Sequence, residues 1–388
     1  MEEEATSVAY DTALSEEQIA VRNLARDFAE TEIRPVVMEF DESQEFPAEI
    51  FRKMAELGFL GITVPTEYDG AGLGFVEYAL IVEEIARVDP SIALGVAAHN
   101  GLCTGHIFKF GSEELKRKYI PRLARGETMG AWGLTEPGSG SDAGGMQTVG
   151  RRDGDGWILN GAKNFITHGT VGDIAVIMAV TNREAGANGI SAFVVDKSMP
   201  GFSASKKENK LGMRCSDTSS LVLEDVHIPA ENLIGEEGEG FRQALQILDG
   251  GRISIAALSV GLGQGALDAS LKYVNERKQF GRKIAEFQGI QFKLAMMATE
   301  VEAARLMTYK AAYMRDHRQD FAVEASKAKY FASEVCVRSA TEAVQIHGGY
   351  GYIKEYPVEK FYRDSKLLTI GEGTSEIQKI VISRAVLK

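Results

Sequence analysis

The sequence of 388 residues is poor in cysteine, in long apolar runs and in positive charge. Its three cysteines, Cys103, Cys215 and Cys336, lie far apart, which excludes a disulfide framework and fits a reducing compartment. No apolar run reaches about 18 residues, so we expect no membrane-spanning helix. Lys and Arg number 43 against 55 Asp and Glu, and the resulting net charge of −12 disfavours nucleic-acid binding.

The first residues, Met1-Glu2-Glu3-Glu4, are acidic. They are therefore neither the basic start of a secretory signal nor an Arg-rich transit peptide. We expect a cytoplasmic protein of bacterial type. A processed mitochondrial matrix protein stays open as the alternative.

The period of the apolar residues divides the chain into three parts. Helical spacing dominates up to about Arg125. Between about Thr128 and Ile234, short runs rich in Val, Ile, Leu and Phe alternate with Gly, Asn and Asp, as in antiparallel strands joined by tight turns. Long helical patterns return after about Gly238 and favour a bundle. We predict an α+β multidomain protein with an N-terminal all-α domain, a middle antiparallel β-barrel or sandwich and a C-terminal helical bundle, at residues 1–127, 128–238 and 239–388.

Individual elements follow from the same periodicity. The sequence S-E-E-Q at 15–18 is a capping box that opens the first helix. The helices that we expect span 15–40, 47–57, 75–86, 113–123, 240–279, 288–316, 321–347 and 375–387. The strands that we expect include 176–180, 190–195, 220–226 and a segment at 157–161 that ends in a turn.

Several patterns that could indicate a nucleotide or metal site favour simpler explanations. Gly138-x-Gly140-x-x-Ala143 and the glycines at 261–265 loosely match a dinucleotide fingerprint, but neither lies at the strand-to-helix junction of a βαβ unit. The second pattern is typical of closely packed helices. His99, Cys103 and His106 would share one helix face, yet no fourth ligand lies nearby in the sequence, so a packed face is favoured over a metal site.

The segment 132–142 is rich in glycine, serine and threonine. Its hydroxyls and free backbone N–H groups could bind a flat heterocycle or a phosphate without any net positive charge. Composition alone favours an ordinary Gly/Ser turn between domains. The choice between these two interpretations depends on the rest of the chain.

Four segments, taken in order, resemble the acyl-CoA dehydrogenase family of flavoenzymes. They are TEPGSGSD at 135–142, RKQFG at 277–281, QIHGG at 345–349 followed by YRD at 362–364, and GEGT at 371–374. The resemblance runs from about Leu14 to the C-terminus and is closest in appearance to the short-chain, butyryl-CoA branch. It implies an N-terminal helical domain, a middle β-domain and a C-terminal four-helix bundle.

The resemblance also implies an activity. The family removes the α-proton and the β-hydride of a saturated acyl-CoA thioester to give the trans-2-enoyl-CoA, with FAD as cofactor and an electron-transfer flavoprotein as the next electron acceptor. A homotetramer and a place in fatty acid β-oxidation are implied as well. An oxidase-like enzyme that uses oxygen, or a dehydrogenase of a branched or cyclic acyl-CoA, is the alternative.

The resemblance assigns roles to residues of this chain. Glu372 is the catalytic base, although a glutamate between two glycines could also be a solvated charge, and burial is expected to raise its pKa. Another branch of the family carries its base where this chain has Gly251. The FAD contacts implied are Trp132, Leu134, Thr135, Gly140, Ser141, Phe165, Ile166, Thr167, Arg277, Phe280, Gln288, Gln345, Ile346, Gly348, Gly349, Thr374 and Glu376. The substrate contacts implied are Ser141, Asp249, Arg252 and Gly373.

One position departs from the family pattern. Short- and medium-chain members often have a tyrosine directly before the base, and this chain has Gly371. Loss of a large ring beside the acyl pocket would widen it. The departure puts the butyryl-CoA assignment in doubt and makes a branched, cyclic or longer acyl group plausible.

Overall fold

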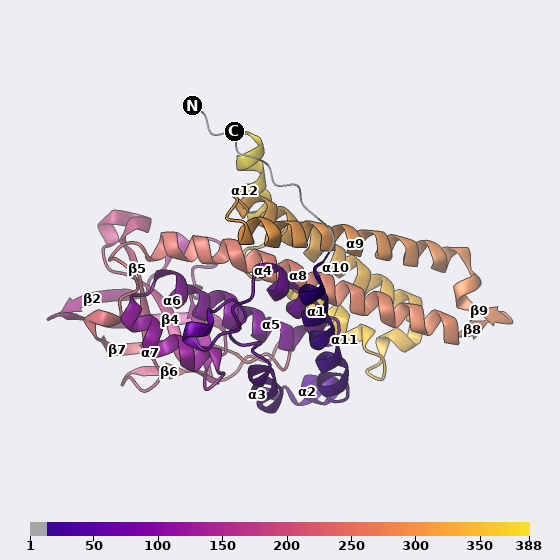
Figure 1. Ribbon diagram of the computed structural model, residues 1–388, viewed down its shortest axis with the longest axis horizontal. Coiled ribbons are helices and arrows are strands. Elements are labelled where there is room, and N and C mark those ends of the chain that lie inside the picture. Colours follow the sequence, from indigo (N-terminus) through magenta and orange to yellow (C-terminus); the bar gives the residue numbers. More distant parts are fainter. Residues whose placement is uncertain (1–13) are drawn as a thin grey trace.

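The computed structural model describes residues 14–388, and the acidic segment at Met1–Glu4 lies outside them. The chain is an α+β protein in which a sheet domain and a bundle of long helices lie at opposite ends of the molecule (Figure 1). The N-terminal helices pack across the long helix α8 (Gly240–Glu276) between these ends (Figure 1). The expected succession of helical, strand-rich and helical parts is confirmed.

The N-terminal part is helical throughout. Its first helix starts with the expected capping box, because Ser15 Oγ accepts from Gln18 N and Gln18 Oε1 accepts from Ser15 N, at 3.1 and 3.0 Å. The single helix expected over 15–40 is instead interrupted by a π-helical turn. The elements are α1 (Glu16–Phe28), the π-turn η1 (Ala29–Ile33), α2 (Val37–Ser43), α3 (Ala48–Glu56), α4 (Phe75–Ala86), α5 (Pro90–Ala98), a second π-turn η3 (His99–Thr104), α6 (Gly105–Phe110) and α7 (Glu113–Ala124).

The middle part is a seven-stranded sheet in the order β1-β4-β2-β3-β7-β6, with β5 paired to β4. Most ladders are antiparallel as predicted, but β1 pairs with β4 in parallel. The turn expected at Gly161 is wrong: β3 continues through it, with a shift of register and a φ of 149°. The strands are β1 (Met129–Gly133), β2 (Val149–Asp153), β3 (Gly156–Thr167), β4 (Gly172–Val180), β5 (Ile190–Asp196), β6 (Phe202–Ala204) and β7 (Thr218–Ile228).

Both faces of β4 are buried, which explains its continuous apolar sequence. Ile174, Val176 and Met178 pack against residues of α6 and α7, whereas the alternate residues Ala175 and Ile177 pack against β3 and β7. The period of two along the strand therefore joins a helical layer to a layer of strands.

The C-terminal part is a bundle around α8 (Gly240–Glu276). Its other elements are β8 (Lys278–Gln279), β9 (Arg282–Lys283), α9 (Gln288–Asp316), α10 (Ala322–His347), α11 (Val358–Leu368) and α12 (Ser375–Val386). By length and composition α8 could cross a membrane, but 78% of its most apolar window is buried inside the protein. In the described part of the chain it is the core helix of the bundle.

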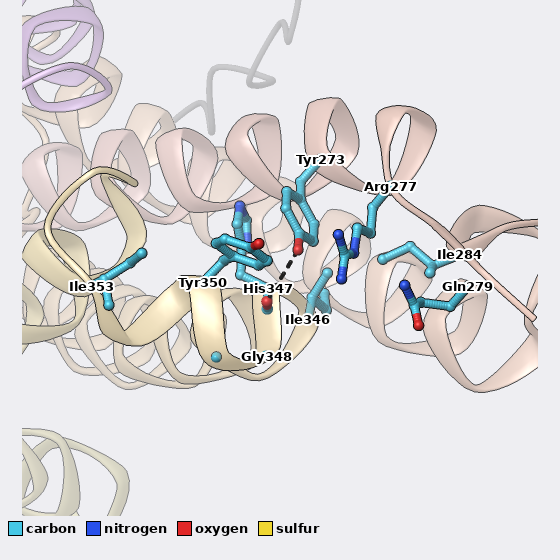
Figure 2. A pocket seen from close by; sticks show the side chains of 10 residues that line it. Tyr273, Arg277, Gln279, Ile284, Ile346, His347, Gly348, Tyr350 and Ile353 are labelled. Carbon is cyan, nitrogen blue, oxygen red and sulfur yellow. Dashed lines mark hydrogen bonds between the residues drawn. The ribbon is translucent and has the colours of Figure 1, made fainter.

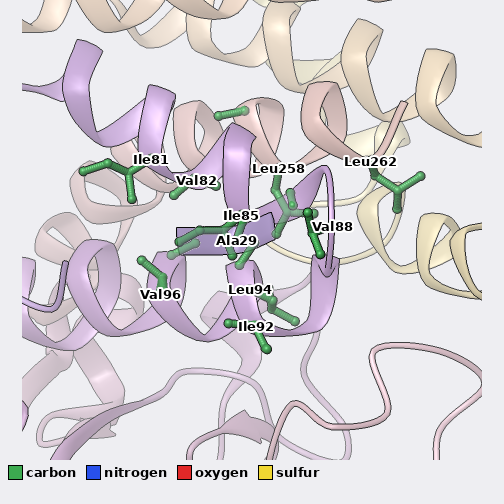
Figure 3. Packing of buried hydrophobic residues seen from close by; sticks show 14 of the residues in the cluster. Ala29, Ile81, Val82, Ile85, Val88, Ile92, Leu94, Val96, Leu258 and Leu262 are labelled. Carbon is green, nitrogen blue, oxygen red and sulfur yellow. The ribbon is translucent and has the colours of Figure 1, made fainter. Parts of the chain in front are cut away.

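Helix α8 also joins the bundle to the N-terminal helices. Leu258 and Leu262 pack against Ile85 and Val88, in a core that includes α4 and α5 (Figure 3). A Cβ atom at Gly261 would lie 2.2 Å from the carbonyl oxygen of Glu83, so only glycine allows this close approach. The prediction that these glycines serve helix packing is confirmed.

Candidate active site

A cavity of about 630 Å³ lies where the three parts of the chain meet. We call it the Glu372 cavity. Its walls are largely aliphatic, with a few polar groups, as in typical small-molecule sites. The lining residues that matter below are Leu94, Ala98, Leu102, Gly130, Trp132, Leu134, Thr135, Gly140, Ser141, Phe165, Ile166, Thr167, Leu248, Arg252, Ile255, Gly371, Glu372, Gly373 and Thr374.

Glu372 lies in the turn between α11 and α12, in a backbone conformation that is unusual for a side-chain-bearing residue. Its φ is 50°, and Gly373 follows with a φ of 93°. The turn is held from behind, because the carbonyl oxygen of Gly373 accepts hydrogen bonds from Lys329 Nζ at 2.6 Å and Gln378 Nε2 at 3.0 Å. A left-handed glutamate that is fixed by its surroundings is typical of a functional site.

The carboxylate of Glu372 is buried and available. Its Oε2 oxygen has no hydrogen-bond partner among the described residues. Burial raises the pKa of Glu372 to about 7, against the lowering effect of the Lys329 and Arg252 charges. The expectation that burial raises this pKa is confirmed, and the interpretation of Glu372 as a solvated charge is wrong. The side chain therefore can both accept and hold a proton near neutral pH.

Gly251 makes room for this carboxylate. A Cβ atom at Gly251 would lie 2.0 Å from Glu372 Oε2. The glycine belongs to the first half of α8, directly before Arg252, in a helix interior where alanine would be more favourable by about 1 kcal/mol. The approach of the carboxylate to the helix is the physical reason for glycine here.

Arg252 is the buried cation of the cavity wall. Its Nη1 donates to Asp249 Oδ1 at 2.5 Å and to Ser326 Oγ at 3.1 Å. Its Nε has no partner within residues 14–388. Asp249 does not line the cavity itself but holds the guanidinium in place. The free Nε is a donor for a polar group of a bound molecule.

Buried neutral histidines support the opposite wall, on β1. His99 Nδ1 accepts from Gly130 N at 3.0 Å, and His168 Nδ1 donates to Gly130 O at 3.1 Å. His106 Nδ1 accepts from the Trp132 indole at 3.0 Å, while its Nε2 donates to Gln243 Oε1. Burial lowers the pKa of His106 to about 4. Among residues 14–388 no group of three His, Cys, Asp or Glu is placed to hold a metal ion.

The Gly/Ser segment after β1 is anchored at its start and open at its tip. Glu136 is buried and forms an ion pair with the buried Lys163 of β3 at 2.6 Å. Beyond it, a Cβ atom at Gly138 or Gly140 would meet nothing within 4 Å. Phe165, on β3, has a φ of 59° and is 67% exposed at the cavity edge. The segment is thus a rigid support with a free face rather than a simple link between domains.

A second cavity, of about 490 Å³, lies at the C-terminal ends of α8 and α10 (Figure 2). We call it the Arg277 cavity; Tyr273, Arg277, Gln279, Ile284, Ile346, His347, Gly348, Gly349, Tyr350 and Ile353 line it. The Arg277 guanidinium lies over the Tyr350 ring, 5.2 Å from its centroid. The ring of Tyr273 stacks on His347 at 4.2 Å, and its hydroxyl donates to His347 O.

The two cavities are far apart in one chain. Arg252 lies in α8, and Arg277 follows directly after the last residue of that helix, 25 positions later in the sequence. At about 1.5 Å per residue this is roughly 37 Å along the axis. The two cavities share no lining residue and are separate sites on one chain.

The structure thus divides the site residues expected from the sequence. Of these, twelve line the Glu372 cavity: Trp132, Leu134, Thr135, Gly140, Ser141, Phe165, Ile166, Thr167, Arg252, Glu372, Gly373 and Thr374. Four line the Arg277 cavity: Arg277, Ile346, Gly348 and Gly349. Asp249, Phe280, Gln288, Gln345 and Glu376 line neither cavity, and Phe280 is 94% exposed.

Other residues of the cavity carry no signal in the sequence. Leu94, Ala98 and Leu102 come from α5 and the π-turn η3, where most neighbours are also small or apolar. Lys329 lies in α10 among alternating alanines and polar residues, and only the structure shows that it supports the Glu372 turn.

Comparison with known proteins assigns the chain to a family. Three models match in succession: the acyl-CoA dehydrogenase N-terminal domain at residues 15–127, the middle domain at 131–226 and the C-terminal domain at 238–387. The chain belongs to the acyl-CoA dehydrogenase family and is an acyl-CoA dehydrogenase enzyme. The resemblance of the four segments is confirmed.

Three individual relatives show how similar the chain is to known members of the family. The chain is 47% identical to a short-chain specific acyl-CoA dehydrogenase of Clostridium acetobutylicum, over 97% of this chain and all of the relative. It is 48% identical to the caffeyl-CoA reductase-Etf complex subunit CarC of Acetobacterium woodii, over 96% and 99%. The solved butyryl-CoA dehydrogenase of Megasphaera elsdenii matches with a TM-score of 0.96 and 42% identity, over 98% and 100%.

Proposed function

We propose that the enzyme dehydrogenates a saturated acyl-CoA thioester between its α and β carbons, giving the trans-2-enoyl-CoA, with Glu372 as the base that removes the α-proton. One observation carries the proposal: Glu372, whose pKa burial raises to about 7, lines an aliphatic cavity, and its buried Oε2 has no hydrogen-bond partner among residues 14–388. A carboxylate with an ordinary pKa of about 4.3 would be a poor base for a weakly acidic carbon.

The walls of the Glu372 cavity fit the isoalloxazine ring of FAD. The exposed ring of Phe165 and the open backbone at Gly138 and Gly140 leave a flat, weakly charged surface. Trp132, Leu134, Thr135, Gly140, Ser141, Phe165, Ile166 and Thr167 would hold this ring. A glutaryl-CoA dehydrogenase of similar fold, from Mycobacterium smegmatis, is known in complex with FADH2. When bound, FAD supplies the acceptor for the β-hydride.

The protein's own groups would prepare the substrate. The backbone N–H of Glu372 would donate to the thioester oxygen, which stabilises the negative charge that develops as the α-proton leaves. Ser141, Arg252, supported by Asp249, and Gly373 would line the path of the pantetheine arm. The aliphatic walls would exclude water from the carboxylate and so maintain its raised pKa.

The Arg277 cavity supports a role for a second copy of the chain. Thr374, which lines the Glu372 cavity, and Glu376 would contact a phosphate of FAD from the start of α12, in the chain that holds the ring. Arg277, Phe280, Gln288, Gln345, Ile346, Gly348 and Gly349 would hold the pyrophosphate and adenine end of FAD. Because about 37 Å separates Arg277 from Arg252 along α8, we propose that this end belongs to a cofactor whose ring lies in a neighbouring subunit. A homotetramer would supply such neighbours.

The next electron carrier that we propose is an electron-transfer flavoprotein, since the relative CarC is named as a subunit of a reductase-Etf complex. The same relative favours a second candidate, reduction of an enoyl-CoA by the reverse reaction. An oxygen-dependent oxidase is the third. Peroxide production, measured with and without an electron-transfer flavoprotein, separates the oxidase from the others. A role in fatty acid β-oxidation follows only if the oxidative direction holds.

The acyl group is proposed to be bulkier than butyryl. The three atoms nearest to a Cβ at Gly371 would all belong to Leu367, at 3.6 to 3.9 Å, which is ordinary contact distance, and Gly371 does not have a positive φ, so its backbone does not require glycine. The missing side chain therefore leaves free volume beside Glu372. The surrounding walls are aliphatic, which favours a branched or cyclic hydrocarbon chain.

The test is anaerobic reduction of the purified flavoprotein by a panel of acyl-CoA thioesters with straight, branched and cyclic chains. We expect the flavin absorbance to bleach with the preferred saturated thioester and to persist in Glu372→Gln. A preparation that binds no flavin, or full bleaching in the variant, would contradict the proposal. The reverse titration with an enoyl-CoA gives the preferred direction.

Two further expectations stay proposals. We propose domain limits at 1–127, 128–238 and 239–388, which the change from helix to strand at β1 and back to helix at α8 supports. We also propose a cytoplasmic location of bacterial type, which the three buried free cysteines support.

A further inference from the structure

Lys329 is a buried cation that the proposed reaction does not yet use. Its side chain comes from α10, has 0% exposure, and donates from Nζ to Gly373 O at 2.6 Å. Burying an ammonium group is costly unless a partner compensates it. Among the described residues, this carbonyl is the one hydrogen-bond partner of Nζ, and the charge that most favours the ionised form of Lys329 is that of Glu372.

Charged and titratable groups from several helices surround Lys329 and Glu372. Helix α8 contributes Arg252 with its partner Asp249, and α10 itself contributes Glu334. Helix α12 contributes the exposed Glu376, and α4 contributes the buried hydroxyl of Tyr78, whose pKa burial raises. Of these groups, the two cations Lys329 and Arg252 favour the ionised form of Glu372.

Position distinguishes the two cations. Arg252 lines the cavity and already has a carboxylate partner in Asp249. Lys329 lies behind the turn, has no carboxylate within salt-bridge distance among the described residues, and binds the peptide directly after Glu372. Its charge is therefore compensated chiefly through Glu372.

We propose that Lys329 is a positioning residue for Glu372: its ammonium group fixes the left-handed turn through the Gly373 carbonyl, and its positive charge stabilises the ionised carboxylate. The inference rests on the proposed role of Glu372 as base. Gln378 provides a second, neutral donor to the same carbonyl at 3.0 Å. The turn therefore keeps one anchor when the charge of Lys329 is removed.

The two contributions of Lys329 can be separated by substitution. Lys329→Gln keeps a hydrogen-bond donor and removes the charge, Lys329→Met removes both, and Lys329→Arg restores both. Lys327→Gln is a matched control, since Lys327 lies two residues earlier on the same helix and pairs with Glu324 at the surface. All four variants are compared with the wild-type holoenzyme.

The first measurement is the pKa of Glu372, from the carboxyl stretching band in infrared difference spectra that is absent in Glu372→Gln. We expect Lys329→Gln to raise this pKa by about one unit, the lower limit for loss of a close opposite charge. The acid limb of kcat/KM should move by the same amount, so that the rate at pH 6 falls about tenfold. Lys329→Arg and Lys327→Gln should stay at the wild-type value.

An unchanged Glu372 pKa in Lys329→Gln would overturn the electrostatic part of the inference. Equal rates at high pH in Lys329→Gln and Lys329→Met would overturn the structural part. If Lys329→Met does not fold, KM and kcat of Lys329→Gln are each compared with the wild-type values. A change in the ratio of KM to kcat would show that the turn containing Glu372 has moved. Full turnover in Glu372→Gln would instead contradict the proposed function, and the infrared titration of Lys329→Gln would still test the coupling.

Discussion

The Glu372 cavity and the Arg277 cavity lie at opposite ends of α8 and differ in what a single chain supplies. The first is enclosed by all three parts of the chain, and Glu372 and Arg252 in its wall each have a buried polar atom that no described residue pairs with. The second lies at the end of the bundle, beside the exposed side chains of Phe280 and Tyr350. This difference is the basis of our proposal that one chain prepares the reacting groups, whereas the distant binding groups serve a neighbouring copy.

Glu372→Gln should have the largest effect on the first cavity. Loss of a general base lowers kcat by about 10²- to 10⁴-fold. In the wild-type enzyme the rate should rise as pH rises through about 7, because the base must be ionised. This acid limb of the pH–rate profile should disappear in the variant. Steady-state kinetics between pH 5 and 9 check it; a limb that survives in the variant would mean that another group is the base.

Gly251→Ala tests whether the first cavity depends on the close approach of the carboxylate to α8. The added methyl would overlap Glu372 Oε2, and misplacement of a reacting group by about 1 Å can cost 10²-fold in rate. The melting temperature should not fall in proportion, because alanine favours the helix by about 1 kcal/mol.

Gly289→Ala is the matched control for this substitution. It lies near the start of α9, where a Cβ atom would meet nothing within 4 Å. We expect wild-type kinetics from it. Equal rates in both alanine variants would show that the Glu372 carboxylate does not use the space at Gly251.

Gly371→Leu should have a smaller and selective effect. The leucine would occupy the volume proposed for a branch or ring of the acyl group, and such steric discrimination is worth about 1–3 kcal/mol. We expect kcat/KM for branched or cyclic thioesters to fall by 10- to 100-fold while that for butyryl-CoA changes little. A uniform decrease for all thioesters would place Gly371 outside the acyl pocket.

Much of the fold could be predicted from periodicity, and the exceptions have physical causes. The helices at 75–86 and 288–316 agree with α4 and α9 to the residue. Helix α5 was not expected because all nine of its residues are buried, which removes any amphipathic pattern. Helix α11 was not expected because its inward face carries Lys360 and Asp364, which form a buried ion pair.

The residues of the candidate site were likewise predictable from the sequence only in part. Residues in loops with motifs, such as Glu372 and Arg277, could be predicted because a distinctive local sequence marks them. Leu102 and Lys329 could not, because they reach the site from helices whose sequences are ordinary. Their roles depend on tertiary packing, which brings η3 and α10 to a turn that is distant in sequence.

The measurement that tests the comparison most directly is complementation between two inactive chains. Glu372→Gln and Arg277→Ala are produced separately and then co-expressed, with Arg282→Ala replacing Arg277→Ala as the control for loss of a nearby surface arginine. If each site combines Glu372 of one copy with Arg277 of another, half of the sites in mixed pairs regain both residues. In a random mixture we expect turnover of about one quarter of wild type and flavin content of about one half, because the Glu372→Gln chains keep Arg277. Activity no higher than that of the separate variants would contradict it.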